Sequence, residues 1–214
     1  LTELHVIWFQ YHHDDERLLL DPILKLTQLR KLTWETQMDT WGEMLNGLPH
    51  LETLFLSFRH NLTDTPWLGT STLQTLTLYN IAHTKHALLA LANMSQLTQL
   101  TLHGDLDGLE DVLKPIAAMK SLTFFSLELP EPTHQTTDGN TTHLVDWIQI
   151  LPASLQSLRL VRAFCGEELD WKWFGKFTQL ISLELDHIGH HLWSDFSGLW
   201  HQIPLTLTSL TLKA

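Results

Sequence analysis

One short phrase, repeated along the whole chain, limits what this sequence can fold into. Residues 94–103 read Met-Ser-Gln-Leu-Thr-Gln-Leu-Thr-Leu-His, so that leucines stand at Leu97, Leu100 and Leu102. Polar residues alternate with the last two of these leucines. Such alternation predicts a short strand with one buried side and one open side.

The phrase Leu-x-x-Leu-x-Leu occurs nine times, with Val6, Trp34 and Phe125 each replacing one leucine. A single repeat cannot bury its own leucine side, so the repeats must stack and join their strands into one parallel sheet. The spacing between successive phrases varies from 22 to 33 residues. The first leucines of the nine phrases are Leu1, Leu29, Leu51, Leu73, Leu97, Leu122, Leu155, Leu180 and Leu207.

This pattern resembles the leucine-rich repeat family, whose repeats run about 20–29 residues. The resemblance covers essentially the whole chain and implies an α/β solenoid of about nine repeats. In such a solenoid a curved parallel sheet forms the concave face, and short helices and irregular segments form the convex face. We expect residues 1–214 to be a single domain and a piece of a longer chain.

The chain departs from the family pattern at one position. The family usually carries Asn or Cys three residues after the third leucine, whereas this chain has, for example, Ile81, Asp105 and Ala163 there. The side-chain ladder made by those residues is therefore absent. We expect an irregular solenoid that is held together mainly by leucine packing.

The segments between the phrases differ in character. Apolar residues at helical spacing predict helices within 15–25, 86–93, 107–116 and 143–151, and Pro22 is expected to end or kink the first. Residues 130–142 contain no apolar side chain and several turn-forming residues, so we expect an exposed loop there.

Composition excludes several classes of protein. The chain has 24 acidic and 13 basic side chains, a net charge of -11 that disfavours binding to nucleic acid. No apolar run approaches the roughly 20 residues needed to span a membrane. One cysteine, Cys165, leaves no internal disulfide, and we expect that residue to be buried.

Localisation is less constrained by the sequence. The lack of a disulfide framework favours an intracellular protein, cytoplasmic or nuclear. Glycosylation sequons favour the alternative, an extracellular protein, although their number is small for a chain so rich in Ser and Thr. The three sequons begin at Asn61, Asn93 and Asn140.

Strand alternation identifies the side chains of the concave face, because positions two, four and six after each first leucine point away from the core. Two groups stand out there. One is aromatic, and its members either anchor a protein partner or pack on each other. The other is charged, and either recognises a partner or forms the ion pairs Arg159–Glu184 and Asp186–Lys213. The candidate partner-binding residues are Phe55, Phe58, Thr77, Tyr79, Thr101, His103, Glu128, Arg159, Arg162, Glu184 and Asp186.

The sequence contains no pattern that predicts catalysis. Histidines are plentiful at 14, but their densest groups, at 12–13 and 190–191, lack a recognised metal-ligand spacing. No phosphate-binding loop, dinucleotide fingerprint or nucleophile motif is found. We therefore expect no catalytic residue, no metal and no cofactor.

These observations predict a non-catalytic scaffold that recognises a protein partner through its concave sheet. The irregular, cysteine-poor repeats look most like those of ribonuclease-inhibitor-like proteins and F-box adaptors, and residues 151–160 are similar to the latter. The resemblance implies a role as the substrate-recruiting part of a ubiquitin-ligase adaptor. The alternative is an extracellular or cell-surface recognition receptor of the same fold.

Overall fold

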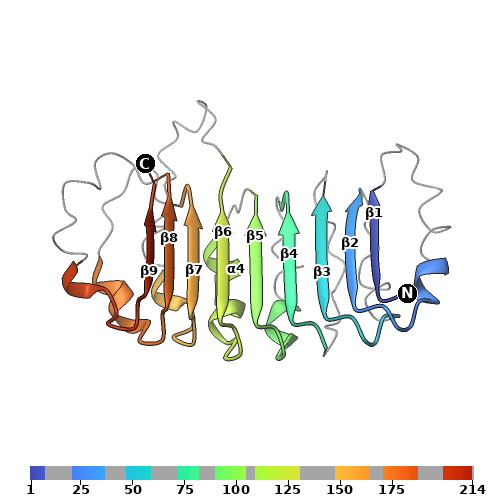
Figure 1. The fold of residues 1–214 in the computed structure, drawn as a ribbon, viewed down its shortest axis with the longest axis horizontal. Coiled ribbons are helices and arrows are strands. Elements are labelled where there is room, and N and C mark those ends of the chain that lie inside the picture. The colour runs from blue at the N-terminus through green and yellow to red at the C-terminus, as the bar shows by residue number, and fades with distance from the viewer. Residues whose placement is uncertain are drawn as a thin grey trace.

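The structure, a computed structural model, describes residues 1–7, 21–36, 47–58, 72–81, 90–104, 109–130, 148–163, 171–187 and 200–213. Nine parallel strands in these segments form one sheet whose strand order follows the chain, as predicted. All strands begin at one edge of the sheet and end at the other (Figure 1). They are β1 (Glu3–Ile7), β2 (Lys31–Thr36), β3 (Thr53–Phe58), β4 (Thr75–Tyr79), β5 (Gln99–His103), β6 (Phe124–Glu128), β7 (Ser157–Val161), β8 (Ser182–Asp186) and β9 (Ser209–Leu212).

The register is the same at all eight strand pairs. Each residue of a phrase lies beside the residue at the same position of the next phrase, as in the row Leu54, Leu76 and Leu100. A shift by one residue would turn a leucine row from the core to solvent. The repeated phrase therefore holds every strand in one register.

One backbone carbonyl joins each strand to the next. The carbonyl of Gln74 accepts two hydrogen bonds, from the backbone N–H groups of Thr98 at 2.9 Å and Gln99 at 3.0 Å. The equivalent carbonyl does the same at every other strand pair. These carbonyls belong to Thr2, Arg30, Glu52, Gln74, Thr98, Thr123, Gln156 and Ile181.

Hydroxyl side chains add a second connection that the sequence analysis missed. Just before a phrase, Thr72, Ser154 and Thr206 each donate a hydrogen bond to the carbonyl of the preceding phrase's first leucine, at 3.0, 2.8 and 2.7 Å. These hydroxyl bonds lie at the edge where the strands begin and add to the leucine packing that is expected to hold the solenoid together.

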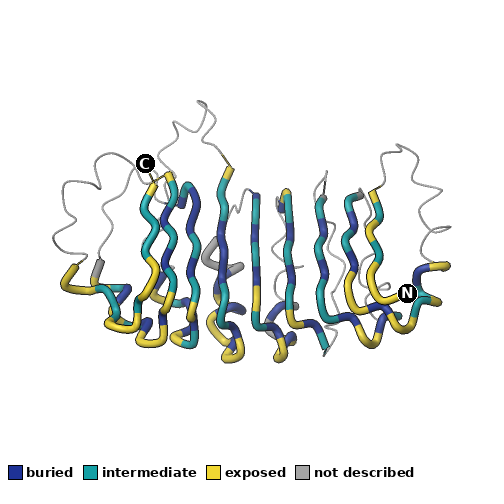
Figure 2. The backbone as a smooth tube through the Cα atoms, viewed as in Figure 1, coloured by how far each residue is buried: buried dark blue, intermediate teal, exposed yellow. Residues whose placement is uncertain are grey.

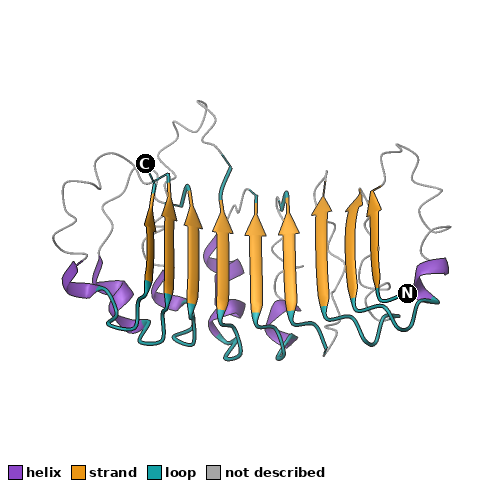
Figure 3. Cartoon of the chain, viewed as in Figure 1, coloured by secondary structure: helices purple, strands orange, loops and turns teal. Residues whose placement is uncertain are grey.

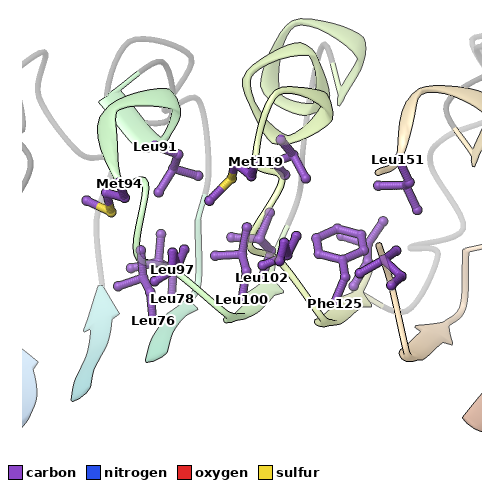
Figure 4. Close-up of a cluster of buried hydrophobic side chains, with 14 of the residues drawn as sticks. Leu76, Leu78, Leu91, Met94, Leu97, Leu100, Leu102, Met119, Phe125 and Leu151 are labelled. Atoms are coloured by element: carbon purple, nitrogen blue, oxygen red, sulfur yellow. The ribbon is translucent and has the colours of Figure 1, made fainter. Parts of the chain in front are cut away.

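The core lies between the leucine side of the sheet and the helical segments (Figure 4). Trp34 and Phe125, which replace leucines, are completely buried. The helical segments contribute Leu91, Leu113 and Ile148, which are also completely buried. At the two ends of the sheet the leucine rows are less enclosed, because β1 and β9 each have a strand on one side only.

The described helices are short and lie toward the edge where the strands begin (Figure 3). They are η2 (Ala90–Asn93), α4 (Leu109–Ala117), η3 (Ile148–Ile150) and η4 (Trp171–Lys176), of which only α4 is an α-helix. Residues 21–24 are also helical. The helix predicted within 107–116 is confirmed. The described parts of 86–93 and 143–151 are single 3-10 turns, which suit short connections better than a full α-helix.

Four strands are followed by a residue with a positive φ. Asn80, Arg162 and His187 have φ near 55°, and Gly104 has φ 144°, all at the same position of their repeats. A Cβ atom at Gly104 would lie 2.5 Å from the backbone N and O of Ile81. Glycine is therefore required there both by the backbone conformation and by the close approach of the neighbouring repeat.

We expect Gly104→Ala to lower the free energy of unfolding by about 3 kcal/mol, the upper range for local backbone strain. Gly175→Ala is the control, because a Cβ there would meet only side-chain and backbone oxygens of Gln202, at 3.6 and 3.9 Å. The control should change stability by less than about 1 kcal/mol. Urea unfolding followed by circular dichroism measures both, and equal midpoints for the two variants would refute the close-packing argument.

Candidate functional site

The candidate site is the side of the sheet opposite the leucine core, here called the open face. It consists of the residues two, four and six positions after the first leucine of each phrase, which alternate along the strands with buried residues (Figure 2). Strand pairing places the predicted rows side by side. Thr77 and Thr101 are half-buried neighbours in the middle row.

Two positions of the open face differ from the prediction. Ser126 and Val161 belong to its rows but are only 1% and 2% exposed. Ser126 lies in register with Arg159, whose Nη1 is 3.5 Å from a carboxylate oxygen of Glu128. Alternation gives the direction of a short side chain, but long neighbours decide whether water reaches it.

Three rings stack across neighbouring strands of the open face and are called the aromatic row: Phe55, Tyr79 and His103. The centroids of Phe55 and Tyr79 are 5.2 Å apart with planes inclined by 29°. Those of Tyr79 and His103 are 4.7 Å apart and inclined by 22°. Tyr79 and His103 are in register, so the strand spacing of about 4.8 Å sets their distance, whereas Phe55 is in register with Thr77 and reaches Tyr79 diagonally. The aromatic side chains therefore do pack on each other, and all three remain half-exposed.

Phe58, which was predicted to join this group, ends β3, and its side chain lies outside the described residues. His103 takes the third place instead, and sequence reasoning named it without foreseeing the stack. The signal was available, since Tyr79 and His103 hold the same position in adjacent phrases.

Charged residues of β6 to β9 form one connected ion-pair network, and Glu128 begins it. The Glu128 carboxylate accepts a hydrogen bond from Arg162 Nη2 at 2.7 Å, and His103 Nε2 lies 3.6 Å from it. Arg162 Nε also donates to the carbonyl of Leu129 at 2.6 Å. The positive φ at Arg162 lets the chain turn as this side chain reaches the preceding repeat.

The network continues to the last strand. Arg159 Nε lies 3.3 Å from Glu184, and Lys213 Nζ lies 2.8 Å from Glu184 and 3.3 Å from Asp186. His187 Nδ1 is 2.8 Å from the other oxygen of Asp186. The predicted pairs Arg159–Glu184 and Asp186–Lys213 are thus confirmed. The network is defined by Glu128, Arg159, Arg162, Glu184, Asp186 and Lys213.

The pKa values of Asp186 and Lys213, at the end of this network, are shifted from their ordinary values. Burial raises the pKa of Asp186, but the hydrogen bond and charge of Lys213, together with His187, outweigh it and lower the pKa below its usual value. Hydrogen bonds to Glu184 and Asp186 raise the pKa of Lys213. Asp186 and Lys213 are therefore held as a charged pair.

The net negative charge of the chain does not come from the described residues. Of the 24 acidic and 13 basic side chains, nine acidic and ten basic ones belong to the described residues. The network itself pairs three acids with three bases. The open face therefore offers a partner little net charge, and long-range steering must come from other parts of the sequence.

Lys176, on the helical side, was missed by sequence reasoning. Its Nζ donates to the carbonyls of Leu151 at 2.7 Å and of Gln149, and lies 4.8 Å from the ring centre of Phe177. Burial lowers the pKa of Lys176 to about 8. The side chain ties η4 to the segment around η3, and nothing in the sequence indicates this contact.

Several residues that were singled out from the sequence are not part of the open face. The histidine groups at 12–13 and 190–191, Cys165 and residues 131–142 of the loop predicted at 130–142 lie outside the described residues. Within the described ranges, no three metal-binding side chains form a cluster. Asn93, which begins one of the three sequons, is exposed. None of the helices in the described ranges has the length and apolarity to cross a bilayer.

Comparisons with known proteins add a likeness at the level of shape. No protein-family model matches the chain, and no match is found among curated protein sequences. Among solved structures, an internalin from Listeria monocytogenes is 18% identical with a TM-score of 0.35, and the alignment covers 89% of this chain. Internalin C2 from the same organism is 17% identical with a TM-score of 0.46, covering 87% of this chain and 82% of that one.

The chain spans 63% of the length of the first internalin, less than two thirds. The fold of the present chain is established by its own strand order and register. Neither likeness informs its partner or activity.

We expect Glu128→Gln to lower the free energy of unfolding by about 1–3 kcal/mol, because two guanidinium groups and an imidazole lose a half-buried charged partner. Glu52→Gln is the control: its pair with Arg30 is exposed, and such pairs contribute at most about 1 kcal/mol. Chemical unfolding of both variants measures the difference. Equal effects would mean that the network adds no more than a surface pair.

We expect Lys213→Gln to change how stability depends on pH. The lowered pKa of Asp186 adds stability above its ordinary value near 3.8, and this stability is lost as pH falls through the folded-state pKa. The melting temperature of the wild type should therefore exceed that of the variant near pH 6, and the gap should narrow as pH falls below 3.8 and Asp186 becomes protonated. A gap that stays constant from pH 6 to pH 2 would show that Asp186 is not the group involved.

Proposed function

We propose that this chain is a non-catalytic interaction scaffold that recognises a protein partner through the open face. The aromatic row carries the proposal: three half-exposed rings stand on adjacent strands of one registered sheet. Aromatic side chains are enriched among the residues that dominate binding energy at protein interfaces. Because strand pairing already orders these rings, a partner would lose little conformational entropy on binding them.

The remaining polar groups of the open face support binding rather than chemistry. Glu128, Arg159 and Glu184 are joined to one another by ion pairs. The hydroxyl of Ser126 is buried, which favours a packing role for it over that of a nucleophile. These contacts give the face rigidity and leave its aromatic part accessible.

A finer form of this proposal is that the chain recruits substrates for a ubiquitin-ligase adaptor inside the cell. Its support is the similarity of residues 151–160 to F-box adaptor repeats. In the structure this segment leads into β7 and buries Leu155, Leu158 and Leu160 in the core. Ubiquitin-ligase core subunits among the captured partners would support this form. Glycan attached at the exposed Asn93 of the native protein would contradict the intracellular placement.

We expect Tyr79→Ala to lower partner recovery by about tenfold, because Tyr79 is the middle ring of the aromatic row. Affinity capture with the native protein, quantified by mass spectrometry, is the measurement. Ile181→Ala is the control, since Ile181 is also an exposed apolar residue but lies outside the open-face positions. Equal recovery with wild type, Tyr79→Ala and Ile181→Ala would remove the aromatic row from the proposed site.

A further inference from the structure

Building on the function proposed above, we infer that the partner docks over β3, β4 and β5 and presents an uncharged, apolar surface there. Such a partner differs from one that places a cationic side chain against the rings and from one that carries charges complementary to the ion-pair network. Three features of the open face carry this inference: how the rings stack, which residues surround them, and how the neighbouring charges are used.

The stacking covers both faces of Tyr79 and leaves the edge of this ring for a partner. Tyr79 has Phe55 at 5.2 Å on one side and His103 at 4.7 Å on the other, both nearly parallel to it. A cation binds an aromatic ring over its face. Because both faces of Tyr79 are occupied, this middle ring is unsuited to hold a methylated lysine or an arginine, whereas its edge and hydroxyl can meet apolar groups and carbonyl oxygens.

Apart from Glu128, whose carboxylate lies 3.6 Å from His103 Nε2, the open-face residues around the rings carry no formal charge. The open-face positions of β3, β4 and β5 contain no Asp, Glu, Lys or Arg, and each is half-buried or exposed. A charged group buried against such a surface would lose its hydration without an ion pair in return. The threonine and serine hydroxyls can exchange hydrogen bonds with an uncharged partner. The nine residues at these positions are Thr53, Phe55, Ser57, Thr75, Thr77, Tyr79, Gln99, Thr101 and His103.

The charged half of the open face is less suited to docking. Arg159 contacts Glu128 and Glu184, and Lys213 contacts Glu184 and Asp186. A charged partner would have to replace contacts that these groups already make, which offsets what the new contacts contribute. The network therefore steadies the sheet beside the docking surface.

Charge scanning tests the inference directly. We expect Thr77→Lys and Thr77→Glu each to lower partner recovery by at least tenfold, and Thr77→Val to keep it within about twofold of wild type. The same changes at Thr211, in the middle row of β9, are the matched control and should leave recovery within about twofold. Circular dichroism spectra and melting temperatures establish that each variant is folded. A loss with one sign of charge and a gain with the other would show a charged partner and overturn the inference.

Photo-crosslinking from benzoylphenylalanine placed at Thr77 or at Thr211 separates the inference from the proposed function. We expect a protein crosslink at Thr77 only, to a partner segment without acidic or basic residues at the contact. A crosslink at Thr211 alone would overturn the docking position while leaving the scaffold role intact. No protein crosslink at either position would overturn both.

A defined cationic probe gives a third test. N-acetyl-trimethyllysine is titrated into the native protein while the side-chain NMR signals of Tyr79 and Phe55 are followed. We expect no saturable shift up to millimolar concentration. A saturable shift that Tyr79→Ala removes would show that the rings do accept a cation over a face, and would overturn the inference.

Discussion

One backbone carbonyl per repeat connects the strands, and the rest of the structure depends on this connection. Each of these carbonyls accepts two N–H groups of the next strand, at eight successive strand pairs. The shared bond places equal positions of neighbouring phrases side by side, so every leucine row faces the core. Leucine burial stabilises the arrangement and, because a shift by one residue would expose a leucine row, it holds the register together with the repeated hydrogen bond.

The same register determines the open face. Because equal positions become neighbours about 4.8 Å apart, side chains of one kind in successive phrases must meet. Rings at equal positions stack, as Tyr79 and His103 do, and opposite charges pair, as Arg159 and Glu184 do, while Phe55 reaches Tyr79 diagonally. The face is thereby divided into an uncharged aromatic part and a neutralised charged part. Binding specificity on such a face arises from which residue type each phrase carries.

Much of this could be predicted from the sequence, because a period of two assigns each strand residue to a side. The nine strands and their parallel order followed from the repeated phrase and the stacking of repeats, and the pair Asp186–Lys213 followed from the period of two within that order. The burial of Ser126 did not, because it depends on how far neighbouring side chains extend. The contact of Arg162 with Glu128 depends on a left-handed backbone at Arg162, and that of Lys176 on a connecting segment. Alternation contains no information on either.

The central claim is that nine repeats lie in one registered sheet with a continuous open face. The most direct test is the distance between spin labels at Thr33 and Thr211, after Cys165 is replaced by Ser, measured by pulsed electron paramagnetic resonance. The labelled residues belong to the middle row of β2 and β9. Seven strand spacings predict a single distribution at or somewhat below about 34 Å, shortened by any curvature of the sheet. A broad distribution, or one centred below about 20 Å, would contradict the registered sheet and the open face derived from it.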